Sequence, residues 1–251
     1  MKNFVTFLNE NSDESVQFTY NNELNTKFWN NYMFDERLRE KLVTISNEFY
    51  SELGYDAPIN DIVLVGSLCN FNYNKYSDLD VHIIVDFKKI NNNTELVKKA
   101  VDSERFAWNL KHNIRIKGHD VELYIQDISD KNISGGIYSL KDAKWITKPI
   151  YKQPEIEEDL INFKFLTYKS GIEQLEEISH REMTPEVAMK NHLFVSEYKK
   201  KIKKERQDDL AEVGEFSVGN LVFKKLRNSG DYGKLIDIDT RLYDKIYSQT
   251  Q

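Results

Sequence analysis

Three acidic residues, Asp78, Asp80 and Glu122, have the types and the spacing that suit a metal-ion site. Asp78 and Asp80 stand two residues apart at the start of the apolar run 79–85, and residues i and i+2 of a strand point to one face. Glu122 lies in a later run of the same kind, so a neighbouring strand can bring a third carboxylate to the pair. Converging carboxylates repel one another, and Mg²⁺, which prefers oxygen ligands, removes that conflict. Two such ions about 4 Å apart can hold the attacking and leaving oxygens of a phosphoryl transfer.

Gly66 and Ser67 follow another apolar run, Ile62-Val63-Leu64-Val65, upstream of the aspartate pair. Glycine lets the backbone approach a phosphate closely, while a serine hydroxyl and nearby backbone amides can donate hydrogen bonds to it. The sequence therefore predicts a phosphate-binding turn at Gly66-Ser67, at the end of a strand.

Taken in order, these segments resemble the DNA polymerase β-like nucleotidyltransferase superfamily over roughly residues 35–150. The resemblance rests on Val65-Gly66-Ser67, Ser77-Asp78-Leu79-Asp80-Val81 and Val121-Glu122-Leu123. It implies an enzyme that transfers a nucleoside monophosphate from a nucleoside triphosphate such as ATP to a hydroxyl group, with release of pyrophosphate.

The resemblance also implies roles for single residues. Asp78 and Asp80 would ligate two Mg²⁺ or Mn²⁺ ions, and Ser67 would hold the triphosphate. Glu122 would ligate the catalytic ion and help to deprotonate the incoming hydroxyl. The family's third position is commonly aspartate, and Asp120 shares a strand face with Glu122. We favour Glu122 because apolar residues flank it on both sides, with Asp120 as the alternative.

The elements that must position these residues can be predicted from periodicity and punctuation. Asp35 is a suitable N-cap for a helix with an apolar face (Leu38, Leu42, Ile45, Phe49 and Leu53), and Gly54 ends it. Strands are predicted over 62–65, 79–85 and 119–126, with a helix over about 94–112 between the last two. Beyond Pro149 and Pro154, helices are predicted over about 155–178, 185–204, 217–228 and 237–247.

These elements predict an α+β fold: a mixed β-sheet nucleotidyltransferase core with helices, followed by an all-α C-terminal extension. The expected parts are an irregular N-terminal arm over 1–33, a catalytic domain over 34–150 and a helical domain over 151–251. His82 shares the strand face of Asp80 and is expected to pack against neighbours. His119, just before the third strand, is expected to be a surface or turn residue.

Composition limits the remaining classes. The net charge of −6 argues against a general polyanion binder, and the single cysteine, Cys69, excludes an intrachain disulfide and a cysteine-rich zinc site. No apolar run approaches the roughly 20 residues that cross a bilayer, and the first residues are too polar for a secretory signal. A soluble, cytoplasmic protein with no membrane partner is expected.

The acceptor can be a small molecule, an RNA or a protein, because no motif in the helical extension identifies it. The run Lys199–Lys204 is by default a solvated helix face, and its functional alternative is a ridge that follows nucleic-acid phosphates. The alternative to an enzyme is a catalytically inactive binding or assembly protein that keeps the nucleotidyltransferase fold.

The first ten residues, Met1 to Glu10, resemble the N-terminal peptides of tailed-phage proteins that are packaged into proheads. Such peptides are cleaved after a Leu-x-Glu pattern, which Leu8-Asn9-Glu10 fits. The resemblance implies a phage-encoded protein that lies in the host cytoplasm or is packaged in the virion.

Overall fold

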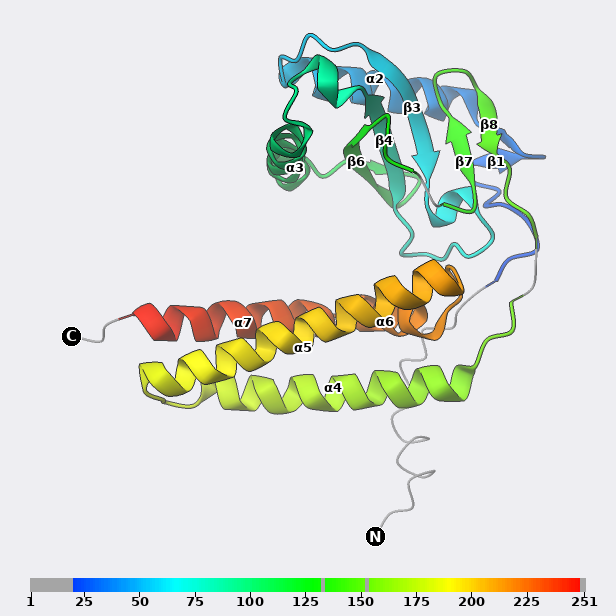
Figure 1. The fold of residues 1–251 in the computed structure, drawn as a ribbon. Coiled ribbons are helices and arrows are strands. Elements are labelled where there is room, and N and C mark those ends of the chain that lie inside the picture. The colour runs from blue at the N-terminus through cyan, green and yellow to red at the C-terminus, as the bar shows by residue number, and fades with distance from the viewer. Residues whose placement is uncertain (1–19, 132–133, 152–153, 249–251) are drawn as a thin grey trace. The chain divides into compact units, whose positions relative to one another are not determined.

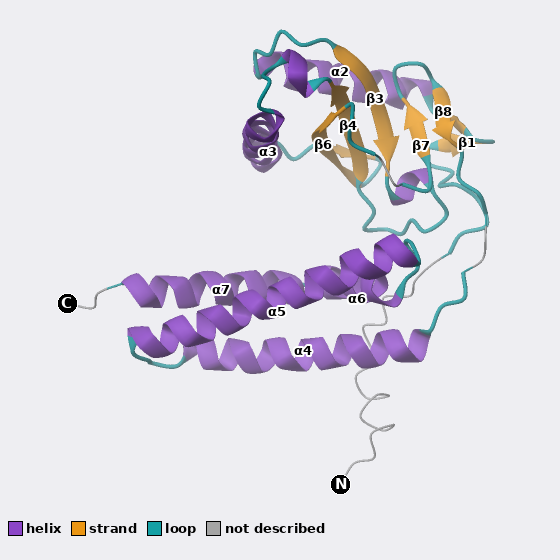
Figure 2. Ribbon diagram, in the orientation of Figure 1, coloured by secondary structure: helices purple, strands orange, loops and turns teal. Residues whose placement is uncertain are grey.

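The computed structural model describes residues 20–131, 134–151 and 154–248, which form two compact units divided before Pro154 (Figure 1). The peptide Met1–Glu10, for which phage-type cleavage is predicted, lies outside the described residues. The β-strands among the described residues all belong to the first unit, whereas the described part of the second is helical (Figure 2). The coarse prediction of an α+β chain with a mixed sheet followed by a helical region is confirmed.

The first unit is built on a six-stranded mixed sheet with the order β5-β6-β4-β3-β7-β8. The pair β4 and β6 is parallel, and every other neighbouring pair is antiparallel. The strands are β3 (Ile59–Val65), β4 (Leu79–Val85), β5 (Arg115–Ile116), β6 (His119–Asp127), β7 (Ile137–Ser139) and β8 (Lys144–Thr147).

One face of the sheet forms the core and is covered by α2 (Glu36–Glu52), which lies across it in Figure 1. The predicted cap is confirmed, since the Asp35 side chain accepts a hydrogen bond from the backbone N–H of Leu38. Leu42 and Phe49 of this helix are fully buried with the inward residues of β4 and β6. The helix α3 (Thr94–Lys111) connects β4 to β5 and packs beside β6, as required between two parallel strands.

Residues 1–19 of the irregular arm predicted for 1–33 lie outside the described part. Residues 20–34 differ from that prediction. They contain the short antiparallel pair β1 (Trp29–Asn30) and β2 (Met33–Phe34). Trp29 and Phe34 are buried in the main core. Because these strands are only two residues long, they show no hydrophobic alternation in the sequence. Burial of their aromatic side chains determines their position.

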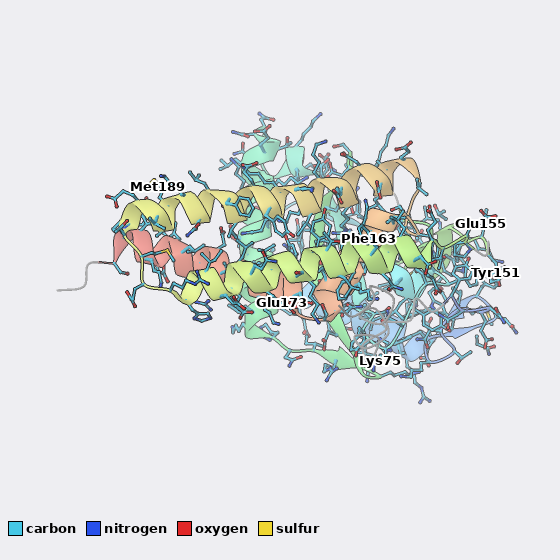
Figure 3. The ribbon with its side chains drawn as sticks, turned by 90° about the horizontal axis from the view of Figure 1, so that it is seen from below. Lys75, Tyr151, Glu155, Phe163, Glu173 and Met189 are labelled. Atoms are coloured by element: carbon cyan, nitrogen blue, oxygen red, sulfur yellow. The ribbon has the colours of Figure 1, made fainter. Side chains whose placement is uncertain are left out.

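The described part of the second unit consists of four helices that pack on one another: α4 (Glu158–His180), α5 (Pro185–Glu212), α6 (Val218–Asn228) and α7 (Asp231–Tyr247). Helix α7 begins at Asp231, earlier than predicted, and buries Leu235 and Ile238. Some large apolar side chains stay exposed, among them Phe163 on α4 and Met189 on α5 (Figure 3). In the ranges described, no helix is both long and apolar enough to traverse a bilayer.

Candidate active site

Asp80 and Glu122 lie opposite each other on adjacent parallel strands. In the register of β4 and β6, Asp80 pairs with Glu122 and His82 pairs with Tyr124. Leu79, Val81, Val121 and Leu123, which alternate with them, are buried in the core. The two carboxylates therefore share the face of the sheet opposite the one that α2 covers.

Gly66 lies directly against Asp80. Val65, at the end of β3, pairs with Asp80, and the chain then turns through Gly66 into a short 3-10 helix, Ser67–Cys69. Gly66 has φ 77° and ψ −163°, a backbone region that is essentially restricted to glycine. A Cβ atom at this position would lie 2.1 Å from Oδ2 of Asp80, so only glycine leaves room for that carboxylate.

The start of β4 is held by Ser77, which is buried immediately before Asp78. Its hydroxyl accepts a hydrogen bond from the Ser67 hydroxyl at 2.7 Å and one from the backbone N–H of Asn74 at 2.9 Å. Its carbonyl accepts one from Nδ1 of His119 at 2.6 Å. The turn after β3, the loop before β4 and the first residue of β6 thus all fix the position from which the aspartates project.

His119 is therefore not the surface or turn residue that the sequence predicted. It is 4% exposed and contacts the Phe28 ring edge-on, with 5.3 Å between ring centroids. The alternation of β6 explains this result, because His119 shares the buried face of Val121 and Leu123.

The N-terminal pair of strands supports the Gly66-Ser67 turn. The indole N–H of Trp29 donates a hydrogen bond to the Leu68 carbonyl at 2.7 Å. The Asn21 amide donates to the carbonyls of Phe71 and Tyr73 at 3.0 and 2.9 Å, in the loop that leads to the aspartates. No pattern in the sequence identified these supports.

Glu122 has a partner that the sequence analysis missed. The Tyr124 hydroxyl donates a hydrogen bond to Oε2 of Glu122. Burial raises the pKa of Tyr124, and the hydrogen bond and the negative charges of Glu122 and Asp80 add to this effect. The signal was the i, i+2 spacing of Glu122 and Tyr124 on one strand face.

His82 packs against its neighbours, as predicted. Its ring lies 4.8 Å from that of Tyr124, and Nδ1 donates a hydrogen bond to Oε1 of Gln126 at 2.7 Å. Burial lowers the pKa of His82, the Gln126 hydrogen bond opposes that shift, and the positive charge of Arg105 adds to it.

Asp120, the alternative third carboxylate, is exposed and is engaged by Nε of Arg115 on β5 at 2.8 Å. It shares the face of Glu122 by alternation, but the strand partner of Asp80 is Glu122. This geometry favours Glu122 over Asp120 as the third carboxylate.

The carboxylates supply the hard oxygen donors that Mg²⁺ takes, and the Asp80 carboxylate fills the room that Gly66 leaves on its Cβ side. Asp78 stands one residue before β4, so strand alternation puts it on the face of Asp80. Over the described ranges, no three Asp, Glu, His or Cys side chains are drawn together as an assembled metal site.

Comparisons of the chain with protein-family models, with curated proteins and with solved structures found no match.

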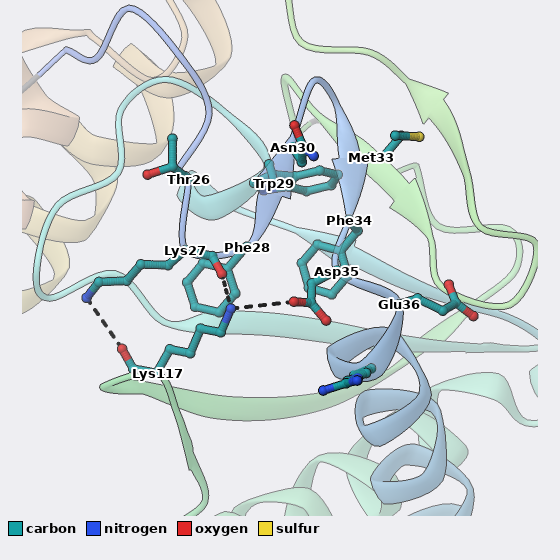
Figure 4. A pocket seen from close by; sticks show the side chains of 11 residues that line it. Thr26, Lys27, Phe28, Trp29, Asn30, Met33, Phe34, Asp35, Glu36 and Lys117 are labelled. Carbon is teal, nitrogen blue, oxygen red and sulfur yellow. Dashed lines mark hydrogen bonds and ion pairs between the residues drawn. The ribbon is translucent and has the colours of Figure 1, made fainter.

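An open pocket of about 470 Å³ lies at the N-terminal end of α2 (Figure 4). Nζ of Lys117 donates to the Lys27 carbonyl and lies 3.6 Å from a carboxylate oxygen of Asp35, while Nζ of Lys27 reaches the Lys117 carbonyl at 3.5 Å. None of the predicted site residues lines this pocket. Its lining is Thr26, Lys27, Phe28, Trp29, Asn30, Met33, Phe34, Asp35, Glu36, Arg37 and Lys117.

In the helical unit, most of the predicted basic ridge, Lys199–Lys204, has acidic partners. Lys199 pairs with Asp239 at 2.7 Å, Lys200 with Glu197 at 2.7 Å and Lys204 with Asp208 at 2.9 Å. The pairs of Lys200 and Lys204 are exposed and fit the default interpretation of a solvated helix face, whereas the pair of Lys199 with Asp239 joins α5 to α7 and is mostly shielded from solvent. Contact with nucleic acid stays a prediction.

Proposed function

We propose that this chain is a metal-dependent nucleotidyltransferase that transfers a nucleoside monophosphate from a nucleoside triphosphate to a hydroxyl acceptor. The observation that carries the proposal is the placement of Asp80. Its carboxylate lies against Gly66, in the turn suited to phosphates, and opposite Glu122 on the neighbouring parallel strand. Asp80 thus adjoins both parts of the proposed site, the phosphate-binding turn and the second carboxylate.

In this proposal Asp78, Asp80 and Glu122 hold Mg²⁺ or Mn²⁺. When bound, the metal neutralises charge that develops on the phosphate oxygens. The acceptor hydroxyl forms a bond to the α-phosphorus, the bond to the β-phosphate oxygen breaks, and pyrophosphate leaves. Glu122 takes the hydroxyl proton, and the backbone at Gly66-Ser67 lies against the triphosphate. The Ser67 hydroxyl now donates to Ser77, so it must rotate before it can donate to a phosphate.

The test uses each of the four nucleoside triphosphates, labelled at the α-phosphate, with Mg²⁺ or Mn²⁺ and a cell extract as the source of acceptor. We expect that at least one of the four nucleoside triphosphates transfers its label to a product, with release of an equal amount of pyrophosphate. Asp80→Asn and Glu122→Gln should each lower the rate at least about 100-fold, the loss typical when one electrostatic contact to the transition state is removed.

Asp120→Asn is the matched control, because it neutralises an exposed carboxylate on the same strand face that Arg115 already engages. Its rate should stay within a factor of about three of the wild type, since surface ion pairs contribute little. Full activity of Asp80→Asn would refute the assignment. The absence of both labelling and metal-dependent nucleotide binding by calorimetry would instead favour the inactive binding or assembly protein.

A further inference from the structure

The hydroxyl of Tyr124 is hydrogen-bonded to Glu122. The two residues stand at i and i+2 of β6, and the hydroxyl donates to Oε2 of the carboxylate. A carboxylate can accept about four hydrogen bonds or metal contacts over its two oxygens. The contact from Tyr124 thus restricts the side-chain rotation of Glu122 and still leaves the second oxygen as a possible ligand.

The Tyr124 ring is itself held by two other elements. The guanidinium of Arg105, from α3, lies 4.6 Å from the ring centroid, and the imidazole of His82, from β4, lies 4.8 Å from it. Arg105 also lies 3.8 Å from the carboxylate of Asp102 on its own helix. Contacts from a helix and a neighbouring strand fix the ring, and a fixed ring fixes the direction of its hydroxyl.

A purely structural role would not require this hydroxyl. Phenylalanine would keep the contacts with Arg105 and His82, because both are made by the ring. What the hydroxyl adds is a hydrogen bond to the carboxylate of Glu122, the residue paired with Asp80 in the parallel register of β4 and β6. Groups that orient a metal-binding carboxylate in this way typically change metal affinity or activity 10- to 100-fold when they are removed.

We propose that Tyr124 is a positioning residue that holds the Glu122 carboxylate in place on the sheet face of Asp80 and thereby makes Glu122, rather than Asp120, the third carboxylate of the metal site. Asp120 has no such device, since its partner is Arg115 at the exposed edge. This inference rests on the proposed function, because it names what organises the same site.

The test measures Mn²⁺ binding by calorimetry, without nucleotide and with a nucleoside triphosphate whose α,β-bridge cannot be cleaved. In Tyr124→Phe the Kd for Mn²⁺ should rise about 10- to 100-fold, the range for loss of an orienting partner. Turnover should fall at low Mn²⁺ and recover as Mn²⁺ is raised, which a loss of packing would not produce. Arg105→Met, which keeps the hydroxyl and frees the ring, should raise the Kd by a smaller factor.

Tyr50→Phe is the matched control. It also removes a hydroxyl in this unit, one that donates to the Ala57 carbonyl at 2.8 Å, but Tyr50 lies on α2 against the opposite face. Its Mn²⁺ affinity should equal that of the wild type. Circular dichroism and thermal unfolding would check that each variant is folded.

The outcomes separate the two claims. Equal Mn²⁺ affinity of the wild type and folded Tyr124→Phe would overturn the inference and leave the proposed function standing. If the wild type binds no Mn²⁺ with or without nucleotide, both fail. Loss of binding in Asp120→Asn but not in Glu122→Gln would also overturn the inference, because it would make Asp120 the ligand.

Discussion

Replacing Gly66 with alanine would place a methyl group where the Asp80 carboxylate lies. The new Cβ would be 2.1 Å from Oδ2 and 3.1 Å from Cγ of Asp80. Non-bonded heavy atoms rest at about 3.5 Å or more, so the carboxylate would have to withdraw by more than about 1 Å. The structure therefore makes Gly66→Ala a direct test of whether the position of Asp80 matters.

The expected magnitudes follow from two separate effects. The backbone region of Gly66, φ 77° and ψ −163°, costs a residue with a side chain about 1–3 kcal/mol of folding free energy. A displacement of about 1 Å at a reacting group can cost about 100-fold in rate. Gly66→Ala should therefore lower stability modestly and lower metal-dependent turnover about 100-fold.

Gly54→Ala separates these effects. Gly54 has φ 70°, but a Cβ there meets no atom within 4 Å, so this variant carries backbone strain without displacing a carboxylate. Both variants should lower Tm by roughly 2–4 °C for each kcal/mol lost, as measured by thermal unfolding. Only Gly66→Ala should also lose nucleotidyl transfer and weaken Mn²⁺ binding. A Gly66→Ala protein with wild-type turnover would refute the argument that the glycine makes room for a working Asp80.

Two further predictions concern buried charges. Asp127 accepts hydrogen bonds from the backbone N–H groups of Phe87 and Ser129 at 2.8 and 2.7 Å, so Asp127→Ala should cost about 1–3 kcal/mol by urea unfolding at pH 7. Burial alone would raise the pKa of Asp127, but hydrogen bonds from Ser129 and Phe87 outweigh it and hold that pKa below 3.8. The stability that the Asp127 carboxylate contributes is thus present above about pH 4 and is lost as the pH falls through the lower folded-state pKa. The stability of Asp127→Ala should therefore fall less steeply with acid than that of the wild type. Burial lowers the pKa of Lys225, whose ammonium donates a hydrogen bond to Asn162 at 2.6 Å inside the helical unit. Because burying a charge costs free energy, Lys225→Met should keep the free energy of unfolding within about 1 kcal/mol of the wild type or raise it. A loss of about 3 kcal/mol would contradict this expectation.

The parts of the fold that the sequence predicted well are those whose signals are local. The N-cap at Asp35 and the period of the following helix gave α2 almost to the residue, and the run 79–85 matches β4. The alternation of apolar and polar residues also placed Asp80 and Glu122 on the faces of their strands that point away from the apolar residues, before the pairing of the strands was known. The register that puts them opposite each other is a non-local property, and no local pattern in these strands specifies it.

The parts that were missed depend on contacts between distant segments. Trp29 belongs to a two-residue strand, and its partner, the Leu68 carbonyl, lies 39 residues away. Arg105 comes from a helix surface, and nothing in its neighbourhood indicates that it lies over Tyr124. His119 was a different error, because the alternation of β6, followed back from Leu123 through Val121, puts it on the buried face.

The one cysteine of the chain, Cys69, lies in the turn that follows Gly66, and its fully buried thiol donates to the Leu64 carbonyl at 3.2 Å. Burial raises the pKa of this thiol, and the charge of Asp80 raises it further, so an alkylating reagent can react only when the turn opens. The labelling rate of the native protein thus reports the free energy of that opening. A nucleotide bound at the turn, at about 100 times its Kd, should slow labelling about 100-fold. Under the proposed function, the labelling rate of Cys69 at one fixed nucleotide concentration would rank nucleotides by affinity before any acceptor is known.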